Sequence, residues 1–363
     1  MKDANGEHTA PAMGILINLP GAQNPLYHRI VLDELRILGS RGALVPLPQQ
    51  CAGCRNLAEL YVLVFSRLEE RHQHESFPNA VPQLFRLLWV AKRGLSEAEA
   101  RDLLGTNHTP LPAAYWSPLR LAIGSCVAIR GGLLSLMTES ARTAVEARYL
   151  SKPGAKTETH VALASWFRTR PPSARRFEEL SWHLLVIDHA PALLALLTEP
   201  ATLAVLPESM LEVWKSRAAW LEDRHQQRAW LYLEAEAFSH NGPAALTAGN
   251  LLLDLGYANR AATFYHLAMR DPECRPAART NLAAALTVYG KIPAALEQFA
   301  LIEEAAHAQR RWRDAAHAAM QQFNLQNEPG SSAEAEACAV RQQKYAEASG
   351  SADVLALCHQ TRG

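Results

Sequence analysis

Apolar residues recur every three or four positions along most of the chain, in stretches separated by proline and glycine. This spacing places apolar side chains on one face of a helix, so the sequence predicts a mainly helical protein. The first helix is predicted from Pro25 to Arg36, with proline in its first turn and Gly39 beyond its end. A second helix is predicted from about Leu57 to Arg71, and its apolar face consists of Leu60, Leu63, Val64 and Leu68.

The pattern changes after Phe77, where three short helical stretches are followed by two short apolar runs around Gly131-Gly132. A Gly-Gly pair suits a hairpin turn because glycine accepts positive φ at both positions. Ser96 and Glu99 form a capping box that opens the second of these helices. Three helices followed by a two-stranded wing are the winged-helix arrangement, a relative of the helix-turn-helix. The predicted segments are helices at 80–92, 96–104 and 113–124 and strands at 126–130 and 133–136.

Helical spacing continues through the centre of the chain, which is divided by Pro153-Gly154 and Pro171-Pro172. Because proline and glycine interrupt helices, these pairs mark the ends of separate helices. The last part of this region is rich in leucine and tryptophan. We therefore expect helices at 138–150, 157–168 and 174–188, and a helical segment at 190–240.

The last third of the chain repeats itself. Gly256 and Gly290 differ by 34 positions, which is the period of the two-helix tetratricopeptide repeat. In such a unit, small residues lie where two antiparallel helices approach most closely, and aromatic residues fill the space beside them. Pro272 separates the two units, because proline cannot continue a helix; chance agreement between two hairpins rich in alanine and leucine is the alternative. The repeat-defining pairs are Gly249 with Ala283, Gly256 with Gly290, Ala261 with Ala295 and Tyr265 with Phe299.

A third, degenerate unit is predicted around Gly330 and Ala335, offset by six residues from the period. Two or three such units need neighbours that cover their faces, and the helices of 190–240 are expected to supply one cap. The concave face of such a stack is a groove suited to a peptide or a helix. Because the first helix of each unit lines this groove, the predicted partner contacts are Asn250, Arg260, Arg279 and Asn281; the alternative is that each is an ordinary solvated residue.

The composition narrows the classes of function. At 363 residues the chain is long enough for two or three domains. Its 36 Lys and Arg balance its 36 Asp and Glu, so bulk electrostatics argue against a protein that coats a polyanion. Apolar residues make up 48% of the chain, but no run approaches the roughly 18 uncharged residues of a membrane span. We therefore expect no membrane partner.

The cysteines and the start of the chain predict a cytoplasmic protein. The first residues lack the basic segment and apolar core of a secretory signal, so the six cysteines are expected to be reduced thiols. Cys51 and Cys54 form a CxxC that is followed by His72 and His74, and a zinc site is the alternative interpretation of these residues. A lone CxxC is a non-specific signal, and no HExxH occurs. The sequence therefore predicts neither a metal nor a cofactor.

Catalysis and DNA binding are the alternative functions. Glu178, Glu179 and His183 share one predicted helix and could form an acid/base site. No nucleophile motif or phosphate loop accompanies them, so the chain is predicted not to be an enzyme. DNA reading by a winged helix needs Arg, Lys, Asn or Gln side chains directed into the major groove, and segment 113–124 offers only Arg120. Nucleic acid is therefore not the predicted partner.

Several segments in a fixed order carry a family resemblance, namely Asn24–Tyr27, Leu32–Arg36, Leu57–Glu69, Leu87–Glu97, Ala144–Leu150 and His160–His183. They extend over about residues 24–190. Together they resemble the STAND class of signal-transduction NTPases, in particular the NACHT-type branch seen in nephrocystin-like chains. Their shared order is more specific than any one of them.

The resemblance implies a mainly α fold, with a winged-helix domain that carries a small β-hairpin and is followed by an α-helical, tetratricopeptide-like solenoid. It also implies that Pro25 lies against a bound nucleotide, and that Thr138 stands where the family often has a phosphate-contacting histidine. No GxxxxGK[ST] occurs, and Glu139 would repel phosphate, so the nucleotide-binding core is missing. The implied domains are a flexible N-terminus (1–23), the helical end of a NACHT-like module (24–75), a winged helix (76–150), a helical connector (151–240) and tetratricopeptide-like repeats (241–363).

The predicted function is that of a non-catalytic regulatory or sensor arm of a STAND-type NTPase. Its repeats would bind a protein or peptide partner, and a separately encoded NTPase core would be a further partner. A free-standing tetratricopeptide adaptor and a winged-helix DNA-binding regulator are the alternatives.

Overall fold

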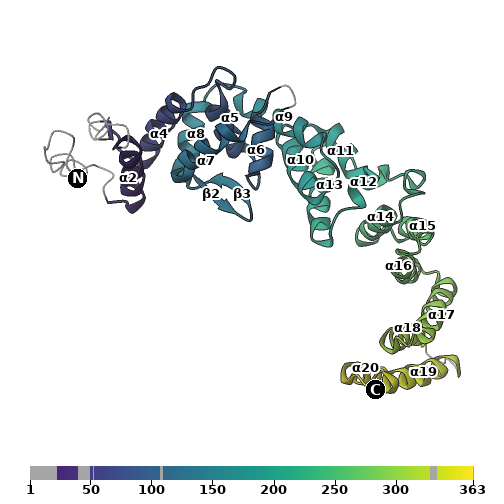
Figure 1. Ribbon diagram of the computed structural model, residues 1–363. Helices are drawn as coiled ribbons and strands as arrows, with labels where there is room; N and C mark the ends of the chain where they lie inside the picture. Colours follow the sequence, from purple (N-terminus) through teal and green to yellow (C-terminus); the bar gives the residue numbers. More distant parts are fainter. Residues whose placement is uncertain (1–22, 40–49, 52, 107–108, 328–332, 363) are drawn as a thin grey trace. The chain divides into compact units, whose positions relative to one another are not determined.

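The computed structural model describes residues 23–39, 50–51, 53–106, 109–327 and 333–362, and its elements are labelled in Figure 1. The predicted flexible N-terminus, up to residue 22, and Gly330 lie outside these residues. The chain divides into two compact units. The first comprises residues up to 170 together with 182–188, and the second comprises 171–181 together with 189–363. The finer domain boundaries expected from the sequence stay predictions.

The first unit begins with two helices joined by a buried carboxylate. α2 spans Pro25–Gly39 and so continues past its predicted end, whereas α4 spans Leu57–Arg71 as predicted. Glu34 on α2 is 3% exposed. Its carboxylate forms ion pairs with the guanidinium of Arg67, at 3.5 Å, and with that of Arg71. A buried carboxylate is stable only with such partners, so these contacts fix α2 on α4.

Three helices and a small antiparallel sheet follow. Ser96 and Glu99 form the predicted capping box, and Gly131 and Gly132 turn the hairpin with φ of 56° and 77°. The strand order in the sheet is β1-β3-β2. The elements are α5 (Ala80–Val90), β1 (Leu95–Ser96), α6 (Glu97–Leu104), α7 (Ala113–Ala122), β2 (Val127–Arg130), β3 (Leu133–Leu136) and α8 (Glu139–Tyr149).

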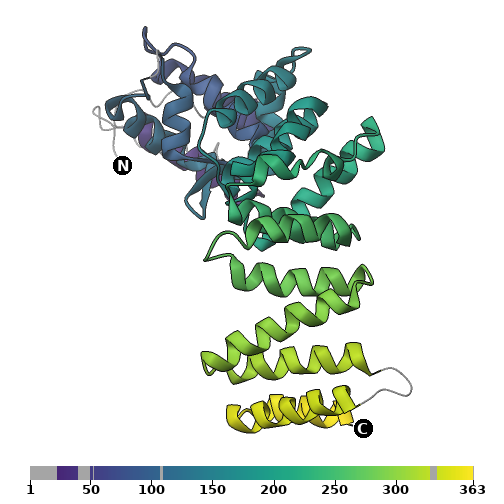
Figure 2. The ribbon, with the colours of Figure 1, turned by 90° about the vertical axis from the view of Figure 1, so that its right-hand side faces the viewer.

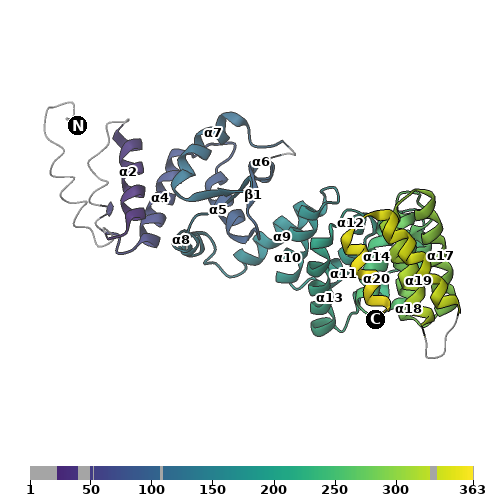
Figure 3. The same ribbon diagram turned by 90° about the horizontal axis from the view of Figure 1, so that it is seen from below.

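The sequence did not predict strand β1, which is labelled in Figure 3. It is two residues long and pairs Leu95 with Leu134 and Ser96 with Leu133. Gly94 makes this pairing possible, because its φ is 96° and a Cβ there would lie 2.2 Å from the carbonyl oxygen of Leu134. Only glycine combines this backbone conformation with so close an approach of a neighbouring strand.

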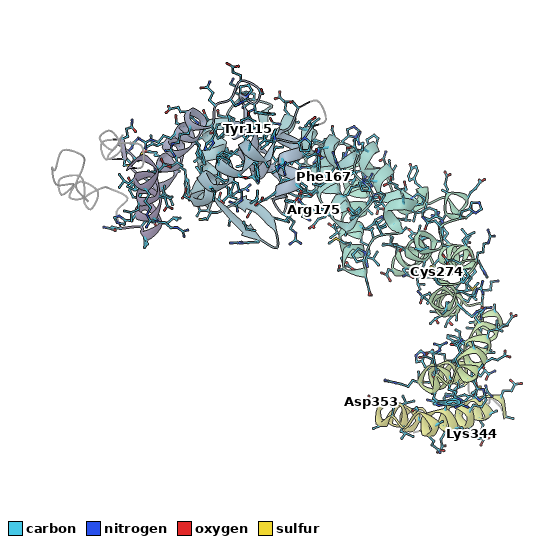
Figure 4. All side chains as sticks on the ribbon, in the orientation of Figure 1. Tyr115, Phe167, Arg175, Cys274, Lys344 and Asp353 are labelled. Atoms are coloured by element: carbon cyan, nitrogen blue, oxygen red, sulfur yellow. The ribbon has the colours of Figure 1, made fainter. Side chains whose placement is uncertain are left out.

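A buried histidine pair lies at the end of the first unit. His160 is on α9 (Ala155–Arg168), which packs against α5, and His183 is on α10 (Ala174–Val186). Their Nδ1 atoms are 2.8 Å apart. Phe167, labelled in Figure 4, stacks on the ring of His183. Only one proton can lie between these two nitrogens, so one ring donates it and the other accepts it.

The segment 190–240 is helical only in its first part, so the prediction of helix up to residue 240 was wrong. Gln226 ends the last helix with a φ of 56°, and the backbone then continues in 3₁₀ turns. The indole of Trp214 donates to the carbonyl oxygen of Leu197 at 2.9 Å and fixes the helices on each other. The elements are α11 (Ala190–Thr198), α12 (Pro200–Leu203), α13 (Leu211–His225) and 3₁₀ turns at Glu208–Met210, Ala229–Tyr232 and Ala235–Phe238.

The rest of the second unit is a stack of antiparallel helices, which Figure 2 shows one beside the next in chain order. α12 packs against the first of them. Within the described part of the chain, no helix has the length and apolar content that crossing a membrane requires. The helices are α14 (Gly242–Asp254), α15 (Ala258–Ala268), α16 (Arg275–Val288), α17 (Ile292–Ala308), α18 (Trp312–Gln326), α19 (Ala333–Ser349) and α20 (Ala352–Arg362).

Three turns of this stack share one capping pattern, in which a residue with positive φ follows a helix. This residue is Gly256 after α14, Gly290 after α16 and Arg310 after α17, with φ of 85°, 78° and 55°. The next amide donates to a carbonyl five residues earlier, as Arg311 does to Ala306 at 2.9 Å. This is the Schellman cap, and it places Arg310 two residues before the start of α18.

Candidate binding groove

The repeat-defining residues lie between paired helices of the stack. Gly249 on α14 faces Tyr265 on α15, and a Cβ at position 249 would lie 2.6 Å from that ring. The missing side chain therefore provides the space for the tyrosine ring. Ala261 on α15 is also fully buried. In the second hairpin, the corresponding positions form one core cluster of Ala283, Ala295 and Phe299.

Three of the predicted partner contacts make hydrogen bonds inside the stack. The Oδ1 of Asn250 accepts the hydroxyl of Tyr265 at 3.0 Å and the Nδ2 of Asn281 at 2.8 Å, which joins α14, α15 and α16. Arg260 lies on α15, the second helix of its hairpin, and donates to the carbonyl oxygens of Trp230 and Leu233. The observed contacts of these side chains are therefore internal, and their role toward a partner stays a prediction.

Arg279 differs from these three residues. It lies on α16, its Nε is buried, and its side chain makes no hydrogen bond or ion pair with the described residues. Its side chain lines a groove of about 460 Å³ between α16, α17 and α18. In Figure 4, the label of Cys274 marks the residue before α16. The groove is lined by Arg275, Pro276, Ala277, Arg279, Thr280, Phe299, Ile302, Ala305, Gln309, Arg311, Asp314, His317 and Ala318.

The groove combines an apolar wall with a basic rim. Phe299, Ile302 and Ala305 form the wall, at positions of α17 that share one helix face. Arg275 is tied to a backbone oxygen, because its Nε donates to the carbonyl of Met269 at 2.9 Å. This bond leaves the charge of the guanidinium uncompensated, so the rim attracts anionic groups.

A buried carboxylate of α17 joins this helix to its neighbours. Glu303 is 6% exposed and accepts hydrogen bonds from Gln322 of α18 at 2.6 Å and from Arg341 of α19 at 2.8 Å. The hydroxyl of Tyr345 donates to it at 3.0 Å. The hydrogen bond with Glu303 raises the pKa of Arg341. These contacts hold three consecutive helices in one register, so the groove wall is pre-formed.

The two positions that the resemblance placed near a nucleotide are both in the first unit. Pro25 begins α2 and lines a hollow of about 460 Å³ together with Tyr27, Arg55 and other residues of these turns. Thr138 caps α8, because its hydroxyl accepts the amide of Ala141 at 3.1 Å. The hydroxyl of Thr138 therefore has a structural role at a helix end.

The residues considered for catalysis or metal binding have other partners. The fully buried carboxylate of Glu179 pairs with Arg175 at 2.8 Å, and His183 contacts His160. Cys51 and Cys54 are free thiols, and burial raises the pKa of Cys51 to about 11. Among the described residues, no group of three His, Cys, Asp or Glu side chains could hold a metal ion.

A relative supports the repeat assignment. A stretch of 163 residues, 45% of this chain, is 23% identical to a TPR repeat-containing protein of Dictyostelium discoideum, where TPR denotes the tetratricopeptide repeat. The chain spans 10% of the length of that protein. No family model matches the chain, and no solved structure matches it. The similarity and the stacked hairpins agree on a tetratricopeptide-like repeat region, which is typical of proteins that bind other proteins.

The residues of the rim outside α16 were missed in the sequence. Arg311 is the residue before α18, and Asp314 and His317 lie on it. This helix begins 37 positions after α16 instead of 34. The sequence did contain a pattern that indicates these positions. Arg275 and Arg279 are four residues apart, and so are Arg313 and His317. Residues four apart share a helix face, so this spacing marks two basic faces at the beginnings of alternate helices.

Proposed function

We propose that this chain is a non-catalytic interaction protein that binds a protein or peptide segment in the groove between α16, α17 and α18. The observation that carries the proposal is Arg279, whose buried Nε has no partner at the edge of an apolar wall. A partly buried guanidinium without a hydrogen-bonded partner is unfavourable, and a carboxylate or carbonyl oxygen bound in the groove would supply one. We propose that the protein needs no cofactor for this binding and acts in the cytoplasm.

Binding would combine two contributions. An apolar side chain of the partner would pack on Ile302 and Ala305, the partly exposed residues of the wall, which removes apolar surface from water. Hydrogen bonds to the arginines of the rim would fix the direction of the bound segment. Because a few anchors supply most of the affinity of such interfaces, the effect of filling the groove should be large.

The groove can be filled by one substitution. Ala277 is an exposed residue of α16 that lines the groove, and Ala300 is an exposed residue of α17 that does not. We expect Ala277→Trp to lower the amount of partner recovered in affinity purification by about tenfold or more, because the indole occupies the space of the bound side chain. Ala300→Trp is the matched control and should recover the wild-type amount.

The comparison is decisive only for folded variants, so both are checked by circular dichroism and thermal unfolding. Equal recovery of the same partner by the Ala277→Trp variant and the wild type would exclude the groove as the binding site. Loss with both tryptophan variants would show that the effect does not depend on the groove.

We further propose that the first unit is a winged-helix regulatory arm of a STAND-type NTPase. Its support is the order of three helices and a β-hairpin, with a third short strand beside the hairpin. DNA reading is not favoured, because Arg120, the basic residue of α7, is paired with Glu97 at 3.0 Å. Co-expression with a Walker A protein encoded by a neighbouring gene tests the proposal: stable co-purification is expected, and separate elution of the two proteins would contradict it.

A further inference from the structure

Two adjoining hollows form one basic strip at the beginning of α18. The groove described above and a second hollow of about 370 Å³ share Arg311 and Asp314. Their linings together contain five arginines and one carboxylate, that of Asp314, although the whole chain has a formal charge of zero. We call this surface the arginine strip, and it consists of Arg275, Arg279, Arg310, Arg311, Arg313 and His317.

Most of the positive charge on the arginine strip is not neutralised within the molecule. Arg311 is paired with Asp314. Arg275 donates to a neutral backbone carbonyl. The side chains of Arg279, Arg310 and Arg313 make no hydrogen bond or ion pair with any described residue. Four guanidinium groups therefore lack an anionic partner along one continuous surface.

The chemistry of the arginine strip defines its occupant. Guanidinium groups bind carboxylates through two parallel hydrogen bonds, and the carboxylate of Asp or Glu fits this geometry. The apolar wall, whose partly exposed residues are Ile302 and Ala305, lies on one side of the groove and suits an apolar side chain of the ligand. A uniformly charged polymer would leave this wall unused.

We infer that the segment bound here is an extended acidic peptide. Its apolar side chain would lie in the groove, and its carboxylates would bind Arg279, Arg310 and Arg313. The inference rests on the proposed function and names the chemical class of its partner. The positions of Arg310 and Arg313 on either side of Trp312 extend the contact from the groove to the α17–α18 turn. The bound peptide therefore spans both hollows.

The test uses the full chain and three fluorescein-labelled peptides in a fluorescence anisotropy titration. The first has the repeated pattern Glu-Glu-Leu-Glu, the second replaces every Glu by Gln, and the third replaces every Glu by Lys. We expect the Glu peptide to bind at least about tenfold more tightly than the Gln peptide, and the Lys peptide not to bind. Affinity should fall between 50 mM and 500 mM salt, because exposed ion pairs are screened.

Three variants locate the binding. Arg279→Glu and Arg313→Glu are each expected to weaken the Glu peptide by about tenfold or more, and Arg313 is exposed, so its replacement leaves the core intact. Lys344→Glu on the exposed surface of α19, labelled in Figure 4, changes the net charge by the same amount and should leave the affinity within about twofold. Arg279→Glu and Arg313→Glu should also bind the Lys peptide more tightly than the wild type does.

Several results would overturn the inference. These are equal binding of the Glu and Gln peptides, equal weakening by Lys344→Glu and Arg313→Glu, or displacement of the Glu peptide by duplex RNA or anionic vesicles at lower concentrations than by unlabelled peptide. If Ala277→Trp still abolishes partner capture while the Glu peptide shows no preference, the inference fails and the proposed function stands. If Ala277→Trp affects neither partner capture nor the peptide, the groove is not the site and both fail.

Discussion

Replacement of Glu303 by alanine is expected to lower the free energy of unfolding of the helical stack by about 2–4 kcal/mol. The carboxylate is buried and accepts hydrogen bonds from Gln322, Arg341 and Tyr345. Removing it leaves Gln322, itself 6% exposed, and the guanidinium of Arg341 without their partner. The side chain of Arg341 is 38% exposed, so water compensates part of the loss and keeps the effect below that of a fully buried pair.

Urea denaturation followed by circular dichroism measures this effect. Glu304→Ala is the matched control, because Glu304 is the next residue of the same helix and is exposed. It should change the free energy of unfolding by less than about 0.5 kcal/mol. Equal small effects of both substitutions would show that Glu303 does not hold α17, α18 and α19 together. A large effect of Glu303→Ala should be accompanied by weaker partner binding, since α17 forms the groove wall.

The first unit is expected to lose stability in acid through the histidine pair. Burial, and to a smaller extent the neighbouring His183, lower the pKa of His160 from its ordinary value of 6.5 to about 4. The unfolded chain therefore binds more protons than the folded chain between these values. The free energy of unfolding of the first unit therefore keeps its full value above about pH 6.5. It decreases by up to about 3 kcal/mol as the pH falls toward 4.

Urea unfolding curves at several pH values between 7.5 and 4 measure this loss. His160→Gln keeps a hydrogen-bonding side chain but removes the titrating group, so its stability should depend less on pH over this range. His266→Gln, at an exposed position of α15, should keep the wild-type pH profile. The same acid loss in the wild type and in the His160→Gln variant would assign the effect to other groups.

Local signals predicted much of the fold. The three- and four-residue spacing, the Ser96–Glu99 capping box and the Gly131-Gly132 turn each specify an element through neighbouring residues alone, and the structure contains all three. Strand β1 has no such signal, because two residues carry no periodicity and the strand exists only through its pairing with β3. The end of α13 was missed since Gln226 adopts a positive φ without being glycine.

The binding groove was predictable only in outline. The 34-residue period indicated stacked hairpins, but it could not show which polar side chains would be used inside the stack. The side chains of Asn250 and Arg260 form hydrogen bonds with other groups of the protein, whereas the side chain of Arg279 forms none with the described residues. Arg311 was missed because the helix that follows it does not keep the 34-residue period. α17 has 17 residues, whereas α15 has 11, and the longer helix shifts the start of α18.

The most direct test of partner binding in the groove is site-specific photocrosslinking. The photoreactive amino acid benzoylphenylalanine is introduced at position 277, which lines the groove, or at position 300, which does not. After irradiation with the acidic peptide or with a purified partner, a crosslinked product is expected from position 277 and none from position 300. Crosslinking from position 300 alone, or equally from both positions, would contradict binding in the groove.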